Sequence, residues 1–304
     1  MLENRNPLVS VVVITYNSSK YVMETLESVK AQTYENIELI ISDDGSTDHT
    51  IEMCRVWLAQ NNNRFPKTKL LTVEENTGIP ANCNRGVRAS TGEWVKLIAG
   101  DDVFFEDCCR NFVNYIQDKK IFILQTSLNL YKDNFEGHNS IGVWEPSKKI
   151  NFFALSANKQ YELLMYGVYV NAPGVFFKRE IFQFITFDEE FRKIEDYPFW
   201  VLATKSGFKI FYTDLQSVKY RIHSGSVQQK STAHMNSEQL KVKEAIKLKY
   251  YDSYRSSFPY YRNMLYNFLD RKGFNKDSPL SKLIYSLTFK ISLLIIWYKA
   301  NVTR

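Results

Sequence analysis

The chain has 304 residues, of which 44% are hydrophobic, 24% are charged and 15% are aromatic. This is the composition of an ordinary globular protein, and it excludes an intrinsically disordered or low-complexity chain. The net charge is +6 overall and +9 within residues 227–304, where 14 basic residues accompany 5 acidic ones, so residues 1–226 carry a net −3. A basic C-terminal part predicts an anionic partner for it, either a membrane surface or a nucleic acid.

The cysteines and the N-terminus both predict a cytoplasmic protein. There is neither CxxC spacing nor zinc-like spacing among the four cysteines, so we expect reduced thiols at Cys54, Cys83, Cys108 and Cys109. The N-terminal sequence MLENRNPLVS lacks the basic and then apolar order of a signal peptide. We therefore expect the chain to stay in the compartment where it is made.

Strands and helices alternate through the first hundred residues. Runs rich in β-branched residues predict buried, parallel-type strands at 8–14, 37–41, 69–73 and 94–98. Apolar residues at helical spacing predict helices at 20–30, 48–60 and 81–89. This alternation predicts a doubly wound α/β layer with right-handed crossovers.

The pattern is looser after residue 102. We predict helices at 105–119, 195–206, 238–254 and 258–272, and strands at 121–127, 172–178, 208–213 and 218–223. Gly207 is expected to end the helix that Glu195 and Asp196 begin. The polar and aromatic residues 129–150 predict an irregular loop or lid.

The last predicted helix, residues 279–300, is apolar with a polar stripe. Lys290 divides its apolar residues into runs that are too short for a membrane span, which needs about 20 residues. Trp297, Tyr298 and the basic surroundings favour an amphipathic helix that lies on an anionic bilayer. The alternative is a helix packed onto the body of the protein or onto a second subunit in a homodimer.

Polar loops follow three of the predicted strands. Asp101 and Asp102 come after the strand at 94–98, and Asp43 and Asp44 come after the strand at 37–41. Adjacent carboxylates repel each other, so a divalent cation that also holds a phosphate would suit them; the plainer alternative is an ordinary turn. The loop after the first strand reads TYNSSK, without the glycines of a dinucleotide-binding site.

Four motifs in order, VSVVVITYN, IELIISDDGSTD, NTGIPANCNRG and TGEWVKLIAGDDVF, resemble the family 2 glycosyltransferases of GT-A fold. The resemblance resumes at KIEDYPFWVLATKSG and YRIHSGSV, so it covers residues 8–227. It implies a mostly parallel α/β sheet with a Rossmann-like nucleotide half and an acceptor half, in a domain of residues 1–227. Residues 228–304 are then a basic helical extension.

The resemblance also implies a set of site residues. A nucleotide sugar would be bound by Thr15, Tyr16, Asn17, Asp43, Asp44, Asn76, Gly78, Arg85 and Asp101. Within a DXD-like element, Asp101 would face the ribose and Asp102 would hold Mn²⁺ or Mg²⁺, with His223 as a further metal contact. Gly100 stands where the family often has aspartate, and Cys83 where many members have arginine, so Arg85 is expected to serve near the phosphates.

The acidic pair Glu195–Asp196 matches the family's catalytic position. An inverting transfer needs one carboxylate to take the proton of the acceptor hydroxyl, and Asp196 is expected in this role, with Glu195 as the second candidate. The plainer alternative is that both merely favour the first turn of a helix.

The implied function is inverting transfer of a sugar from a nucleotide diphosphate sugar, expected to be a UDP-sugar, to a glycan or polyprenyl-linked acceptor. This would serve bacterial polysaccharide biosynthesis at the inner face of the cytoplasmic membrane. Rival hypotheses are a membrane-docking protein that binds nucleotide sugar without turnover, and a sugar-1-phosphate nucleotidyltransferase. Nucleic-acid binding by the basic part is disfavoured by the aliphatic last helix.

Overall fold

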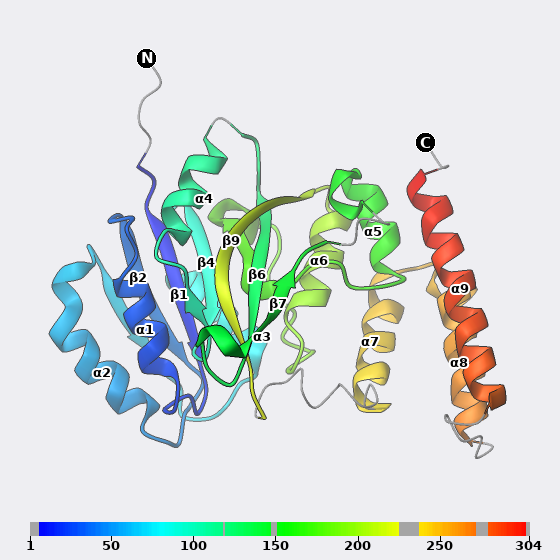
Figure 1. Ribbon diagram of the computed structural model, residues 1–304, viewed down its shortest axis with the longest axis horizontal. Helices are drawn as coiled ribbons and strands as arrows, with labels where there is room; N and C mark the ends of the chain where they lie inside the picture. Colours follow the sequence, from blue (N-terminus) through cyan, green and yellow to red (C-terminus); the bar gives the residue numbers. More distant parts are fainter. Residues whose placement is uncertain (1–5, 118, 147–150, 225–236, 272–278, 302–304) are drawn as a thin grey trace.

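The computed structural model describes residues 6–117, 119–146, 151–224, 237–271 and 279–301, and Figure 1 shows one twisted sheet with helices on both faces. The strand order is β3-β2-β1-β4-β8-β6-β9-β5, with β7 beside β6. The strands are β1 (Val9–Thr15), β2 (Ile37–Asp43), β3 (Thr68–Leu71), β4 (Trp94–Ala99), β5 (Val103–Phe104), β6 (Ile123–Lys132), β7 (Ser140–Trp144), β8 (Val175–Lys178) and β9 (Ile210–Ile222). The α-helices are α1 (Val22–Lys30), α2 (Thr50–Asn61), α3 (Ile79–Ala89), α4 (Cys108–Ile116), α5 (Ala157–Leu164), α6 (Asp196–Lys205), α7 (Ser237–Tyr250), α8 (Phe258–Arg271) and α9 (Pro279–Asn301).

Strands β1 to β4 form the parallel half of the sheet, as predicted. Val12 of β1 is paired with residues of both β2 and β4. Val11 and Val13 point into a core cluster with Trp57 of α2, whereas Val12 points to the opposite face and clusters with Val87 of α3. Because both faces of β1 are buried, the strand is a continuous run of β-branched residues rather than an alternation of apolar and polar ones.

The other half of the sheet is mixed. Strand β8 runs antiparallel to both β4 and β6, while β9 runs parallel to β6. The prediction of two strands at 208–213 and 218–223 is wrong, because β9 is one strand that spans both segments. The pairing of β9 with β6 shifts register between Gln125 and Leu128, which accommodates the polar residues between the two predicted strands.

The predicted loop at 129–150 is wrong at residues 129–132 and 140–144, which are strands. Strand β6 continues to Lys132, and β7 folds back onto β6. These strands carry polar and exposed residues because only part of each strand is covered, so their sequence lacks a strong strand pattern. Residues 147–150 lie outside the described residues. Helix α5, which follows them, was not predicted.

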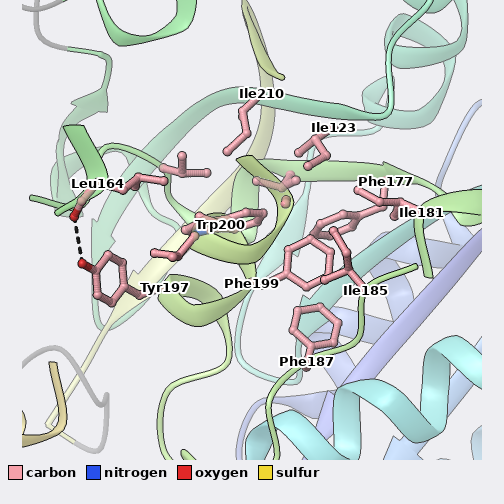
Figure 2. Close-up of a cluster of buried hydrophobic side chains, with 14 of the residues drawn as sticks. Ile123, Leu164, Phe177, Ile181, Ile185, Phe187, Tyr197, Phe199, Trp200 and Ile210 are labelled. Atoms are coloured by element: carbon pink, nitrogen blue, oxygen red, sulfur yellow. Dashed lines mark hydrogen bonds between the residues drawn. The ribbon is translucent and has the colours of Figure 1, made fainter. Parts of the chain in front are cut away.

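Aromatic side chains make up much of the core beneath α6 (Figure 2). The rings of Phe177 on β8 and Trp200 on α6 are stacked, with centroids 5.8 Å apart. The Tyr197 hydroxyl donates to the Leu164 carbonyl at 2.8 Å, which attaches the first turn of α6 to the end of α5. Gly207 follows α6 with a φ of 88°, as expected of a residue that ends a helix. These contacts hold the start of α6, where the acidic pair lies.

Helices α7 to α9 extend from the sheet at one end of the molecule (Figure 1). Tyr250, Tyr254 and Ile296 are buried in the same cluster as Trp200. The described part of the helical extension therefore shares a core with the sheet. The expected domain boundary at 227/228 lies outside the described residues and stays a prediction. No described helix is long and apolar enough to cross a membrane.

Candidate active site

The loops after β1 and β2 meet at the carboxyl edge of the parallel strands. Thr15 Oγ1 donates to Asp43 Oδ2 at 2.8 Å, and these two residues are also partners in the β1–β2 ladder. Asn17 has a φ of 50°, and its side-chain oxygen accepts the Thr47 N–H at 2.9 Å. Tyr16 is largely exposed. The structure thus brings these predicted nucleotide-binding residues together, with the Tyr16 ring at the surface.

Asp44 is a buried carboxylate with several neighbours. Its Oδ2 accepts the N–H groups of Gly78 at 2.8 Å and Thr77 at 3.1 Å. Arg85 Nη2 lies 3.2 Å from Asp44 Oδ1. These contacts fix the orientation of Asp44 and place Arg85 beside it. The expected roles of Asp44 in base recognition and of Arg85 near the phosphates stay predictions.

The loop after β3 connects the two halves of the protein. Gly78 has a φ of 99°, and a Cβ at this position would lie 2.9 Å from the Arg192 carbonyl oxygen. The side chain of Arg192 donates to the Asn76 carbonyl at 2.7 Å. Because Arg192 precedes α6, the predicted site residues Asn76 and Gly78 are in direct contact with the segment that leads into α6.

Cys83 of α3 lies behind this loop. Burial, and then the neighbouring charge of Glu195, raise the pKa of the Cys83 thiol well above its usual range. The thiol therefore stays neutral, so Cys83 supplies no positive charge at the position where the resemblance implies an arginine.

Gly100 follows β4 where the first loop comes close. A Cβ at position 100 would lie 2.9 Å from Thr15 Cγ2 and 3.2 Å from Ser18 Cβ. A larger residue would force these loops apart, which is a physical reason for glycine where the resembled family often has aspartate.

Asp101 and His223 come together although they are far apart in sequence. His223 Nε2 lies 3.0 Å from Asp101 Oδ2, and both side chains are partly exposed. The Tyr21 ring packs beside the imidazole, with centroids 4.7 Å apart. A carboxylate oxygen and an imidazole nitrogen side by side are a donor set that suits a divalent cation such as Mn²⁺.

In contrast to Asp101, Asp102 is fully buried. Its Oδ1 accepts the Arg221 backbone N–H at 2.9 Å, and its Oδ2 has no hydrogen-bond partner among the described residues. Burial, and then the charge of Asp101, raise the pKa of Asp102 well above its usual range. The geometry therefore favours Asp101 over Asp102 as the carboxylate that reaches a metal; both roles stay predictions.

Arg221 is a site residue that sequence analysis missed. Its buried guanidinium donates to the carbonyls of Asp101 and Asp133, each at 2.7 Å. The Tyr21 and Phe135 rings lie 4.4 and 4.1 Å from the guanidinium carbon. Arg221 thus holds the Asp101 backbone in place from the interior of the protein. The available signal was an arginine inside a predicted strand, since a buried arginine requires partners.

The second acidic pair lies at the start of α6. Asp196 Oδ1 accepts the Tyr197 N–H at 2.6 Å. Burial, and then the charge of Asp196, raise the pKa of Glu195 to about 8. Burial also raises the pKa of Asp196, although the Tyr197 N–H and then Lys243 partly oppose this rise. The pair therefore holds a proton more readily than ordinary carboxyl groups do.

Tyr220 of β9 links the two acidic pairs. Burial raises the pKa of its phenol most, and Asp102, Asp101, Glu195 and Asp196 raise it further, in that order. The pKa of the Tyr220 phenol therefore responds to the charge of both acidic pairs.

Within the described residues there is no group of three or more His, Cys, Asp or Glu side chains that could by itself hold a metal ion. Asp101 and His223 fit as two ligands of an oxygen- and nitrogen-bound divalent cation. Such a cation would need further ligands from water or from a bound diphosphate.

Comparison with known proteins shows the family of the chain. The model of the glycosyl transferase family 2 matches residues 10–182. The Escherichia coli UDP-Glc:alpha-D-GlcNAc-diphosphoundecaprenol beta-1,3-glucosyltransferase WfaP is 28% identical over 222 residues, which cover 72% of this chain and 79% of that protein.

Solved structures share the fold. TarS of S. aureus in complex with UDP-GlcNAc has a TM-score of 0.59 at 19% identity, over 96% of this chain and 81% of that one. The mannosyltransferase PcManGT of Pyrobaculum calidifontis, in complex with GDP-Man and Mn²⁺, has a TM-score of 0.52 at 17% identity, over 98% of this chain and 88% of that one. With a family match over more than half of its length, the chain belongs to glycosyl transferase family 2.

Proposed function

We propose that the protein transfers one sugar from a UDP-sugar to a hydroxyl group of a glycan acceptor, with inversion at the anomeric carbon. The observation that carries this proposal is the contact between the loop after β3 and Arg192, which precedes the acidic pair Glu195–Asp196: the Arg192 side chain donates to the Asn76 carbonyl at 2.7 Å. Asp101 and Asp102 form the other acidic pair. One pair comes from the nucleotide half and the other from the acceptor half. A donor bound at the first pair would present its sugar to an acceptor held at the second.

Asp196 is the proposed base. It takes the proton of the acceptor hydroxyl while the oxygen forms a bond to the anomeric carbon. The bond between that carbon and the diphosphate oxygen breaks, and its electron pair leaves with the nucleoside diphosphate. A raised pKa suits Asp196 to this task, because a carboxylate that binds protons more readily is a stronger base. Glu195 is the second candidate.

Asp101 and His223 would hold Mn²⁺ or Mg²⁺, and Asp102 would support Asp101 from the interior. When bound, such an ion offsets the charge of the diphosphate leaving group. The nucleotide itself would lie against Thr15, Tyr16, Asn17, Asp43 and Asp44, with Arg85 near its phosphates.

A lipid-linked glycan is the proposed acceptor, in polysaccharide biosynthesis. Support comes from WfaP, whose name specifies a diphosphoundecaprenol-linked acceptor and a UDP-glucose donor. The proposal places residues 1–227 in catalysis at the inner face of the cytoplasmic membrane, and residues 228–304 in attachment to that membrane.

Donor binding can be tested by thermal-shift measurements with UDP, UDP-glucose, UDP-GlcNAc and GDP-mannose, with and without Mn²⁺. We expect stabilisation by at least one UDP-sugar that is greater when Mn²⁺ is present. Stabilisation by GDP-mannose alone would overturn the choice of UDP, and no response to any donor would overturn the function.

Catalysis is tested by the Asp196→Asn variant, with the exposed Asp214→Asn as the matched control. We expect Asp196→Asn to lose sugar transfer while it keeps UDP binding, and Asp214→Asn to resemble the wild type in both. Transfer that persists in Asp196→Asn would exclude Asp196 as the base. NMR of the product decides the stereochemistry, and retained anomeric configuration would refute inversion.

A further inference from the structure

Helices α8 and α9 lie side by side at the end of the molecule that is opposite α2 (Figure 1). Helix α9 is held to the body at its C-terminal part. Lys299 Nζ lies 3.3 Å from Glu162 Oε2 of α5, and Ile296 is buried in the core. These contacts determine which face of α9 is turned inward.

The inward face of α9 is unexpectedly polar. Thr288 and Ser292 are buried there. Thr288 Oγ1 is hydrogen-bonded to the Tyr266 hydroxyl, and Arg262 Nη1 of α8 donates to Ser292 Oγ at 2.9 Å. The hairpin is therefore held together partly by hydrogen bonds between polar side chains rather than by an apolar seam alone.

The outward face of α9 is mostly apolar, with the exposed Lys290 among its leucines. The exposed fractions are 65% for Leu283, 57% for Leu287, 66% for Leu294, 54% for Trp297 and 53% for Tyr298. Tyr261, Met264 and Phe268 of α8 are exposed by more than half as well. We call these eight residues the hairpin apolar surface. A helix at a water-exposed protein surface normally has the opposite arrangement, with its apolar face inward.

An apolar surface of this kind requires a partner that covers it. We propose that the hairpin apolar surface inserts into the headgroup region of an anionic lipid bilayer. This inference deepens the membrane attachment in the proposed function and rests on it for the choice of a cytoplasmic membrane. Helix α9 would lie along the bilayer, with Trp297 and Tyr298 at the level where amphipathic aromatic rings are favoured.

Charge favours anionic lipid over other partners. Residues 258–304 contain 8 lysines and arginines but only 2 acidic residues. Helix α9 itself contains Lys282, Lys290 and Lys299 and no aspartate or glutamate. Basic residues beside an interfacial helix are attracted to the negative surface of a membrane, and long lysine side chains can reach the headgroups.

The same charges oppose a second copy as the partner. A two-fold contact between two α9 helices would bring the exposed Lys290 of both copies into one interface, without a carboxylate from either α9. Crossing of the bilayer is not the proposed mode, because no described helix is long and apolar enough.

Flotation of the full-length protein with vesicles tests the proposal without any nucleotide sugar or acceptor. Vesicles would contain phosphatidylcholine alone or phosphatidylcholine mixed with phosphatidylglycerol. We expect binding to the mixed vesicles that weakens at high salt, and at least tenfold weaker binding to the neutral ones. The Leu287→Glu/Leu294→Glu variant should bind at least tenfold more weakly than wild type.

Val56→Glu is the matched control, because Val56 is 52% exposed on α2, at the other end of the molecule. Its binding to vesicles should equal that of wild type. All three proteins should unfold at similar temperatures, since the substituted side chains are exposed. Equal binding by both variants, or no binding by the wild type, would overturn the proposal.

Trp297 provides a second readout. Of the five tryptophans, Trp57, Trp94 and Trp200 are buried and Trp144 is partly buried, so Trp297 is the most exposed. Brominated lipids should quench wild-type fluorescence, and the quenching should be lost in Trp297→Phe. Persistent quenching in that variant would place another part of the protein at the membrane.

Light scattering identifies the competing outcome. A wild-type dimer that becomes monomeric in Leu287→Glu/Leu294→Glu, together with absent vesicle binding, would show that the surface pairs with a second copy and would refute the proposal. Donor stabilisation is measured separately, so failure of membrane binding leaves the test of sugar transfer intact.

Discussion

Replacing Glu195 by glutamine should stabilise the folded protein at alkaline pH. Burial and the Asp196 charge raise the pKa of Glu195 from 4.5 to about 8. Between these values the folded state keeps a proton that the unfolded state has lost, so wild-type stability falls as pH rises through this window. Glutamine has nearly the same shape and carries no charge, so the variant avoids that loss.

The magnitude follows from the difference of about 3.5 pKa units, which corresponds to an upper limit of about 5 kcal/mol at 1.36 kcal/mol per unit. Because Glu195 is only partly enclosed and shares the effect with Asp196, we expect about 2–5 kcal/mol.

Urea unfolding of wild type and Glu195→Gln at about pH 5 and about pH 9 measures this difference. The two proteins should have similar stability at the lower pH, and the variant should be more stable at the higher pH. The exposed Glu180→Gln serves as control and should follow the wild type at both pH values. Stability curves of wild type and Glu195→Gln that run parallel across this range would refute the reasoning.

Three further substitutions test the supports of the site. Arg221→Met should lower the free energy of unfolding by about 2–5 kcal/mol, because the carbonyls of Asp101 and Asp133 lose their buried donor. The variant should also weaken Mn²⁺-dependent stabilisation by a donor, and an unchanged donor response would contradict the positioning role. Phe177→Ala should lower the free energy of unfolding, measured by thermal unfolding, by about 3–5 kcal/mol, because it leaves a cavity beside Trp200. A loss below about 1 kcal/mol would argue against the stacked core. Burial lowers the pKa of Lys96 from 10.5 to about 8, so between these values the unfolded state holds a proton that the folded state has lost. As pH rises through this window, the free energy of unfolding of wild type should therefore increase by up to about 3 kcal/mol relative to that of Lys96→Met. A stability difference that stays constant over this pH range would refute the lowered pKa.

The parallel half was predictable from sequence because its signals are local. Strands β1, β2 and β4 are buried on both faces, so each is predominantly apolar, and the polar residues that follow must lie at one edge of the sheet. The motifs also identified both acidic pairs, although sequence order could not say that Arg192, just before α6, contacts the loop after β3.

The mixed half of the sheet could not be predicted from the sequence, because its structure depends on contacts between residues that are distant in the chain. Strand β9 is long because β6 provides a partner along it, with a register shift where polar residues intervene. Asp101 and Asp102 are neighbours in sequence, yet Arg221 and β9 enclose one and His223 accompanies the other at the surface. No local pattern distinguishes two adjacent carboxylates, because burial is decided by the chain that packs over them.

Helix α9 also combines features that follow from the sequence with features that only packing decides. Its length, its lysines and its apolar content are properties of the sequence alone. Which face it turns inward depends on Arg262, Tyr266 and Glu162, which bond to its polar side and leave its leucines outward. The sequence by itself determined the parallel half of the sheet and the family resemblance, whereas packing between distant segments decided which side chains face water and which face one another.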